Sequence, residues 1–307
     1  MKSSNIGGQA VLEGIMMKHE DEYSVAVRKP DGEIFVKKDE YHGVIGWKPL
    51  KKVPFIRGVF NFIDSMVLGI QALTYSADIY EEEDEHDTKD KKKKFITTCV
   101  TFFSVAAAIG IFVVLPYFLS SLLLKPVVSS YTWCTVFEGF MRIGMFIVYV
   151  LLISRMEDIQ RTFMYHGAEH KCINCIEHGL PLTVDNVRKS SRQHKRCGTS
   201  FLFFVCAIGI ILLLLIQVES PLLRVVVRIA LLPVIAGISY EILKLAGRSE
   251  NPLVNFFSKP GLAIQRLTTK EPDDDMIEVA IRAVEAVFDW KKYEAENFGN
   301  AEDFSGR

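Results

Sequence analysis

The chain has 307 residues and a formal net charge of -1, and 49% of its residues are hydrophobic. A dedicated nucleic-acid-binding protein would carry a clear excess of basic residues, so the near-neutral charge predicts no nucleic-acid partner. The mean hydropathy is +0.19, and the apolar residues gather in long runs between about residues 95 and 246. This distribution is typical of a protein that crosses the bilayer several times.

Residues 1–80 are predicted to form a cytoplasmic unit of strands followed by an amphipathic helix. Residues 9–17 are apolar and extended, and a second pair of extended segments flanks Pro30-Asp31-Gly32. Proline presets φ and glycine accepts a positive one, so this triplet predicts a turn of a β-hairpin. Residues 55–75 have apolar residues at helical spacing, which fits a helix on the membrane surface or one that covers the sheet.

Four later segments are long and apolar enough to span a bilayer, which takes about 20 residues per helix. They are residues 95–124, 135–153, 200–218 and 221–245. Short connections within each pair predict two antiparallel transmembrane hairpins, residues 95–153 and 200–246. A charged linker, residues 81–94, precedes the first hairpin and is expected to be solvated.

Basic residues predict the orientation of these spans. They concentrate in the central loop between residues 155 and 200, just before the first span and just after the fourth. Because positively charged loops stay on the cytoplasmic side, we expect both termini and the central loop in the cytoplasm. The chain is therefore predicted to be a multi-pass protein of the cell membrane, in contact with the lipid bilayer.

Two spans carry charged residues in their predicted outer halves. Glu138 and Arg142 are one helical turn apart in the second span, and Arg224 and Arg228 are one turn apart in the fourth. Charges inside a bilayer are costly and usually pair, so we expect a Glu138–Arg142 or Glu138–Arg228 ion pair in a polar groove between helices. Arg224 is expected to reach the outer headgroups instead.

Residues 247–307 are predicted to form interfacial segments and a C-terminal cytoplasmic helix. Residues 253–267 are apolar but interrupted by Pro260 and Gly261, which indicates short segments. Pro272 and the three aspartates that follow it favour a helix start, and the helix is expected to run to about residue 293. Its predicted buried stripe is Ile277, Ile281, Val284 and Phe288. The predicted fold is an α-helical polytopic membrane protein with four transmembrane helices, plus a small cytoplasmic α+β unit of N-terminal strands and C-terminal helix.

The cytoplasmic loop, residues 154–199, is rich in histidine and cysteine and carries the strongest functional signal. His166, Glu169 and His170 form the His-x-x-Glu-His pattern of the inverted zincins. On a helix the two histidines share one face, so both can bind one divalent metal ion, with zinc the expected metal. Glu169 lies beside them and is the candidate catalytic residue, as general base for a metal-activated water.

A catalytic zinc site usually needs a third protein ligand. Glu177 is on the same helix face, but it lies roughly 10 Å further along the axis and cannot share the metal. His194 or Cys197, from the end of the loop, is the better candidate. Cys172 and Cys175 with His194 and Cys197 form an alternative set with structural-zinc spacing. Ordinary capping and hydrogen bonding by these side chains is a further interpretation that the pattern leaves open.

Five sequence blocks resemble the YqhQ-like family. They are residues 7–17, 165–171, 182–186, 194–201 and 267–274. The resemblance covers about residues 6 to 290 and implies a bacterial inner-membrane protein of unknown function, commonly described as a metal-dependent enzyme. His166, Glu169, His170, His194 and Cys197 fall within these blocks, whereas Cys172 and Cys175 do not match motif positions. The paired glycines of the first block suggest close backbone packing, with the N-terminal strand near the loop.

Two functions are compatible with these patterns. The first is a metal-dependent hydrolase at the cytoplasmic membrane face, with Glu169 as base and the metal ligands His166, His170, His194 and Cys197. The alternative is a non-enzymatic membrane factor that binds another membrane protein or the protein translocation or insertion machinery, through the polar groove and the cytoplasmic segments. A small-solute transporter is less favoured, because four spans would require oligomerisation and no internal repeat is visible.

Overall fold

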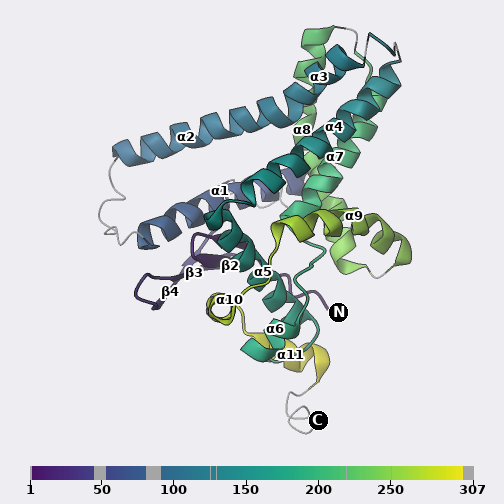
Figure 1. The fold of residues 1–307 in the computed structure, drawn as a ribbon. Helices are drawn as coiled ribbons and strands as arrows, with labels where there is room; N and C mark the ends of the chain where they lie inside the picture. The colour runs from purple at the N-terminus through teal and green to yellow at the C-terminus, as the bar shows by residue number, and fades with distance from the viewer. Residues whose placement is uncertain are drawn as a thin grey trace.

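The computed structural model describes residues 2–44, 53–80, 91–124, 126–128, 130–218, 220–249 and 251–299. Long helices extend to one side of the molecule, and a small sheet with shorter helices lies at the other (Figure 1). Most of the predicted charged linker lies outside the described residues. Its last residues are helical, because helix α2 begins at Lys91.

The N-terminal residues form a four-stranded antiparallel sheet in the order β1-β2-β3-β4. The strands are β1 (Gly7–Val11), β2 (Gly14–His19), β3 (Glu22–Arg28) and β4 (Ile34–Glu40). The predicted hairpin turn at Pro30-Asp31-Gly32 is confirmed, and Gly32 has a φ of 90°. The prediction of a single extended segment over residues 9–17 is wrong, because the chain reverses between Val11 and Gly14.

That unpredicted reversal depends on Glu13. Its φ is 47°, which is unusual for a residue with a side chain. Both carboxylate oxygens of Glu13 accept hydrogen bonds of 2.5 Å from the Arg161 guanidinium, on a helix far along the chain. A tertiary contact therefore stabilises the turn, and neither of its two central residues, Leu12 and Glu13, is a glycine or asparagine.

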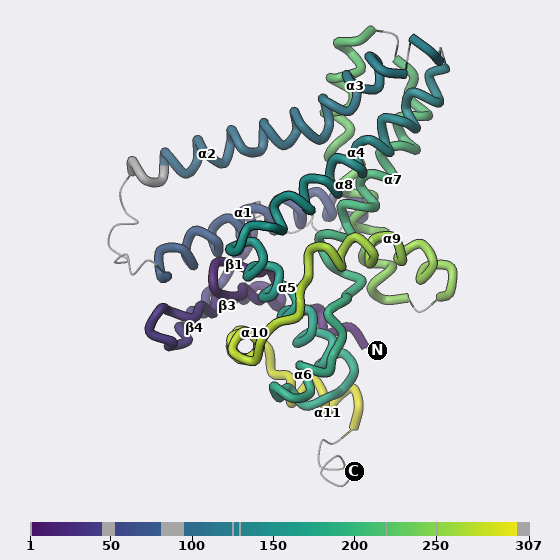
Figure 2. Tube along the Cα trace, in the orientation of Figure 1, coloured from purple at the N-terminus to yellow at the C-terminus, as the bar shows by residue number. Residues whose placement is uncertain are grey.

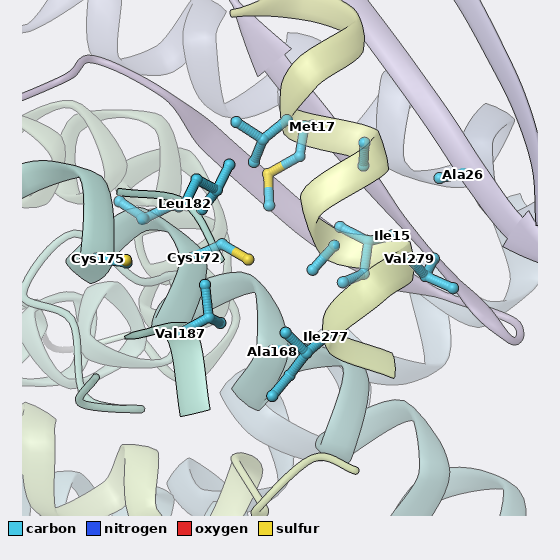
Figure 3. Packing of buried hydrophobic residues seen from close by; sticks show 14 of the residues in the cluster. Ile15, Met17, Ala26, Ala168, Cys172, Cys175, Leu182, Val187, Ile277 and Val279 are labelled. Carbon is cyan, nitrogen blue, oxygen red and sulfur yellow. The ribbon is translucent and has the colours of Figure 1, made fainter. Parts of the chain in front are cut away.

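The two faces of the sheet pack against different helices, because alternate side chains of a strand point to opposite faces. Val11, Met16, Val25 and Val27 pack against Leu68 and Ala72 of helix α1 (Ile56–Tyr80). The other face packs against helices α5 (Glu157–Glu177) and α10 (Asp274–Val287), and Figure 3 shows part of this larger core. Helix α1 thus covers the sheet, as one of the two predicted alternatives requires.

Five helices of the described residues are long and apolar enough to cross a membrane. They are α1, the continuous helix Phe95–Leu123 made of α2 (Lys91–Ile109), η3 (Gly110–Val114) and α3 (Leu115–Leu123), and the helices α4 (Tyr131–Ile153), α7 (Gly198–Leu215) and α8 (Pro221–Arg248). All four predicted spans are therefore helical, and α1 is a fifth candidate by length and composition. Helix α3 packs against α4 and α7 packs against α8, as the two predicted hairpins require.

The predicted intramembrane ion pairs both form, and they share one carboxylate. Glu138 accepts two hydrogen bonds from Arg228, of 2.9 Å from Nε and 2.5 Å from Nη2. Arg142 Nη2 donates a third, of 3.2 Å. All three residues are at most 8% exposed, so they form a buried polar cluster between the helices, and an open groove leading to it stays a prediction. Arg224 lies over the Tyr131 ring, with its guanidinium 5.4 Å from the ring centroid.

The C-terminal region differs from the prediction in two places. Helix α9 (Pro252–Thr268) continues through Pro260, because its small and polar side packs closely on α7, with Gly261 against Ser200. The helix predicted from residue 272 to 293 is instead two helices, α10 and α11 (Trp290–Phe298). Asp289 begins the second by accepting a hydrogen bond from the Lys292 backbone N–H. In the predicted stripe, Ile277 and Val284 are buried and Ile281 and Phe288 partly so.

One hydrophobic core joins the sheet, the central loop with α5 and α6 (Val184–Lys189), and helix α10. The chain trace shows strands from the start of the sequence beside helices from its end (Figure 2). This confirms an α+β unit built from both ends of the chain, to which the loop also contributes. The sheet, the central loop and helix α10 are therefore held together as one packed unit.

Candidate metal centre

Helix α5 presents the two motif histidines on one face, as their spacing predicts. Glu157 and Asp158 occupy its first turn, where acidic side chains complement the helix dipole. The ring centroids of His166 and His170 are 4.4 Å apart. The predicted helix around the motif is therefore confirmed, although a break at residues 154–156 separates it from α4.

Gly167 allows another segment to approach this helix closely. A Cβ atom there would lie 2.0 Å from the Lys270 carbonyl oxygen. The Lys270 backbone N–H also donates a 2.9 Å hydrogen bond to the Phe163 carbonyl. The chain that follows α9 is thereby held against the motif helix.

His166, His170 and Cys197 bring three potential ligand atoms together. These atoms all lie within 4.8 Å of one another, and Cys197 Sγ is 3.3 Å from His166 Nε2. Cys197 precedes the first residue of α7 and is buried. The partial positive charge of a helix N-terminus favours the thiolate form of such a cysteine, which is the form that binds metal ions.

Backbone carbonyls orient both histidines. His166 Nδ1 lies 2.9 Å from the Thr268 carbonyl oxygen, and His170 Nδ1 lies 2.7 Å from that of Arg192. A carbonyl can only accept, so each Nδ1 carries the hydrogen and donates it. Both Nε2 atoms are then left to face the thiol or a metal ion. Metal-binding histidines in proteins are usually held in this way.

The charges within the cluster stabilise one another. Burial would lower the pKa of His166, but the adjacent Cys197 and Glu169 raise it to about 9. Burial would raise the pKa of the Cys197 thiol, but His166 and His170 hold it well below its usual value. Without a metal, the site therefore favours a thiolate beside an imidazolium. That thiolate suits a soft divalent metal such as zinc.

Glu169 lies at the edge of the cluster, with Oε2 4.0 Å from His166 Nε2. Burial raises the pKa of this carboxyl group, while the two histidines and a hydrogen bond from the Gly8 backbone lower it. A Cβ atom at Gly8 would lie 2.8 Å from Glu169 Cγ, so only glycine fits without a shift. The predicted close packing near the loop is confirmed for Gly8, whereas a Cβ atom at Gly7 would meet no atom within 4 Å.

His194 lies outside this cluster. Its Nε2 is 3.2 Å from Glu177 Oε2, and Gln265 exchanges two hydrogen bonds of 2.9 Å with its backbone. Its ring centroid is 6.0 Å from that of His170. Burial lowers the pKa of His194, so the neutral imidazole donates its Nε2–H to the carboxylate. Its predicted role as a metal ligand stays a prediction.

The alternative cysteine set is not assembled. Cys172 and Cys175 are fully buried in the core of the α+β unit (Figure 3), where burial raises the pKa of both thiols. Cys175 Sγ donates to the Leu180 carbonyl at 3.4 Å. Among the described residues, neither cysteine belongs to a group of three or more ligands that could share a metal ion.

The residues that orient the site were not predicted. Thr268 and Arg192 orient the histidines through their backbone carbonyls. Every residue type has such a carbonyl, so the sequence does not show which residues act in this way. The block resemblance at residues 267–274 marked the right segment for Thr268 without indicating its role.

We expect Gly167→Ala to destabilise the α+β unit by about 1–3 kcal/mol, because the added methyl group forces the Lys270 segment away from α5. The measurement is the thermal unfolding midpoint of the purified chain. Gly144→Ala is the matched control, since a Cβ atom there meets no atom within 4 Å. Equal midpoints for the two variants would contradict the close approach.

Comparisons with known proteins agree with the resemblance in the sequence blocks. The family model described as "Protein of unknown function (DUF1385)" matches residues 53–290. The uncharacterized protein YqhQ of Bacillus subtilis (strain 168) is 38% identical over an alignment of 291 residues that covers 90% of each chain. No solved structure matches the chain.

Proposed function

Since the chain belongs to the DUF1385 family, whose description states no reaction, we propose a function from the site alone. The protein is a membrane-anchored, metal-dependent hydrolase that holds one divalent metal, zinc by its donor chemistry, on His166, His170 and Cys197. The observation that supports this is the convergence of three donor atoms with both imidazoles pre-oriented. Three protein ligands are typical of catalytic zinc sites, which keep a further position open.

The chain's own groups suit hydrolytic chemistry. A metal held there would supply a Lewis acid for a carbonyl or phosphoryl oxygen. Glu169 is the general base of the proposal, because it is a buried carboxyl group beside the cluster and burial raises its pKa, which makes it a better proton acceptor. The Gly8 backbone keeps this carboxylate beside the cluster. We infer that the site faces the cytoplasm, since the segment that carries it is rich in basic residues.

The first test is the metal content of the full chain, purified in detergent. We expect about one zinc ion per wild-type chain and less than about a tenth of that in His170→Ala and Cys197→Ala. His178→Ala is the matched control, because His178 directly follows the same helix and its ring hydrogen-bonds the Asn174 carbonyl, away from the cluster. His194→Ala is also expected to keep the metal. Wild-type metal content in both ligand variants would refute the site.

A second test separates an enzyme from a closed structural site. If Glu169 acts as a base, Glu169→Gln keeps its metal, and a cobalt-substituted protein changes its visible spectrum when azide is added. If Glu169 is instead a fourth ligand, the variant loses metal and azide has no effect. That second result would exclude the hydrolase. The alternative, a membrane factor for another protein, stays a prediction, because these two tests address only the metal centre.

A further inference from the structure

The cluster of Glu138, Arg142 and Arg228 between the long helices carries two positive charges and one negative charge. All three side chains are buried among α4, α7, α8 and α3. Within the described parts of these helices, the other acidic residue is Glu241. It pairs with Arg57 on α1 and belongs to the opposite end of α8. One positive charge in the cluster therefore has no counter-ion among the described residues of these helices.

Arg228 uses its whole guanidinium group. Its Nε and Nη2 donate to Glu138, and its Nη1 donates to the Arg224 carbonyl at 3.3 Å. Its plane also lies over the Tyr117 ring, 4.4 Å from the centroid. The carboxylate is thus bound mainly to Arg228, in the two-point geometry that makes arginine–carboxylate pairs strong.

Arg142 does not use its guanidinium group in this way. It makes one hydrogen bond, of 3.2 Å to Glu138, and its buried Nε has no partner among the described residues. The residue is 8% exposed. Its Nη1 lies beside Gly209 of α7, 3.5 Å from the position that a Cβ atom would occupy there. Such a buried, under-used cation is costly at membrane depth, and usually marks a functional site with a partner.

We propose that Arg142 is the centre of an anion-binding site between α4, α7 and α8, independent of the metal centre. Its ligand is a carboxylate or phosphate group, because the planar arginine fork matches the oxygen pairs of these anions. Such a group can come from the headgroup of an anionic lipid or from a free anion. A purely structural role for the cluster would be served by Glu138 and Arg228 alone, and gives no reason for the second cation.

The test is native mass spectrometry of the full chain in detergent, titrated with phosphatidylglycerol, with phosphatidylcholine, or with inorganic phosphate. We expect wild type to bind one anion of either source, and Arg142→Gln to bind it about tenfold more weakly. Binding of phosphatidylglycerol without phosphate assigns the site to lipid, and the reverse assigns it to a free anion. Phosphatidylcholine, which has no net charge, should show no dependence on Arg142.

Two further variants keep the result interpretable. Arg224→Gln removes a nearby cation that contacts Tyr131 and is expected to bind like wild type. Arg142→Lys keeps the charge and should recover part of the affinity, even if Arg142→Gln folds poorly. Equal binding of phosphatidylglycerol and phosphate by wild type, Arg142→Gln and Arg142→Lys would overturn the proposal. The proposal would also be overturned if the wild-type chain bound no small anion but co-purified with an acidic membrane protein that Arg142→Gln no longer retained.

Discussion

Glu138→Leu is expected to lower the free energy of unfolding by about 3–5 kcal/mol, the largest effect of a single substitution in the long helices. The carboxylate accepts three hydrogen bonds from two arginines and is 2% exposed. Removing it leaves Arg142 and Arg228 as buried charges that repel each other. The measurement is the thermal unfolding midpoint in detergent, followed by tryptophan fluorescence.

A triple variant provides the control for this prediction. Replacing Glu138 with leucine and both arginines with methionine removes all three charges and keeps similar volumes. Because well-packed apolar residues often stabilise as much as a buried ion cluster, we expect the triple variant to unfold near the wild-type midpoint. If the triple variant were as unstable as Glu138→Leu, lost packing and not uncompensated charge would explain the effect.

The parts of the fold that the sequence predicts are those governed by local pattern. The hydrophobic runs predict the long helices, and the His-x-x-Glu-His spacing predicts which face of α5 carries the histidines. Cys197 was one of two candidates for the third position, and the metal-ligand geometry favours it over His194. The choice could not be made from spacing, because it depends on how Gln265 of α9 fixes the backbone of His194.

The features that the sequence does not predict depend on contacts between distant residues. Glu13 adopts its positive φ beside Arg161, which is 148 residues away in the chain. Gly8 is required by Glu169, on a different element of the fold. Helix α9 passes through Pro260 because α7 packs along its small and polar side. Local propensity disfavours the positive φ of Glu13 and a helix through Pro260, and tertiary packing stabilises both.

Glu177→Ala is expected to lower the free energy of unfolding of the α+β unit by about 3–5 kcal/mol. The Glu177 carboxylate is completely buried, and it accepts hydrogen bonds from the Ser4 backbone and hydroxyl, from His194 and from Arg196. Its removal leaves the Arg196 charge without its partner and releases the N-terminal segment from the loop. Limited proteolysis near residue 4 should therefore accelerate together with the loss of stability.

The same carboxylate makes stability depend on pH. Burial would raise the pKa of Glu177, but His194, Arg196 and Ser4 lower it below the ordinary value of 4.5. Burial also lowers the pKa of His194 below 6.5. In both cases the unfolded chain binds the proton more readily, so stability falls as the pH falls.

The two contributions occupy different pH ranges and can be separated by substitution. The His194 contribution is present above about pH 6.5 and declines below it, and the Glu177 contribution declines only below about pH 4.5. His194→Gln should therefore reduce the pH dependence of the unfolding midpoint between pH 7 and 5. Glu177→Gln should reduce that dependence only at more acidic pH. A wild-type midpoint that rises on acidification would mean that His194 is buried as the imidazolium, and the neutral donor assigned to it would be wrong.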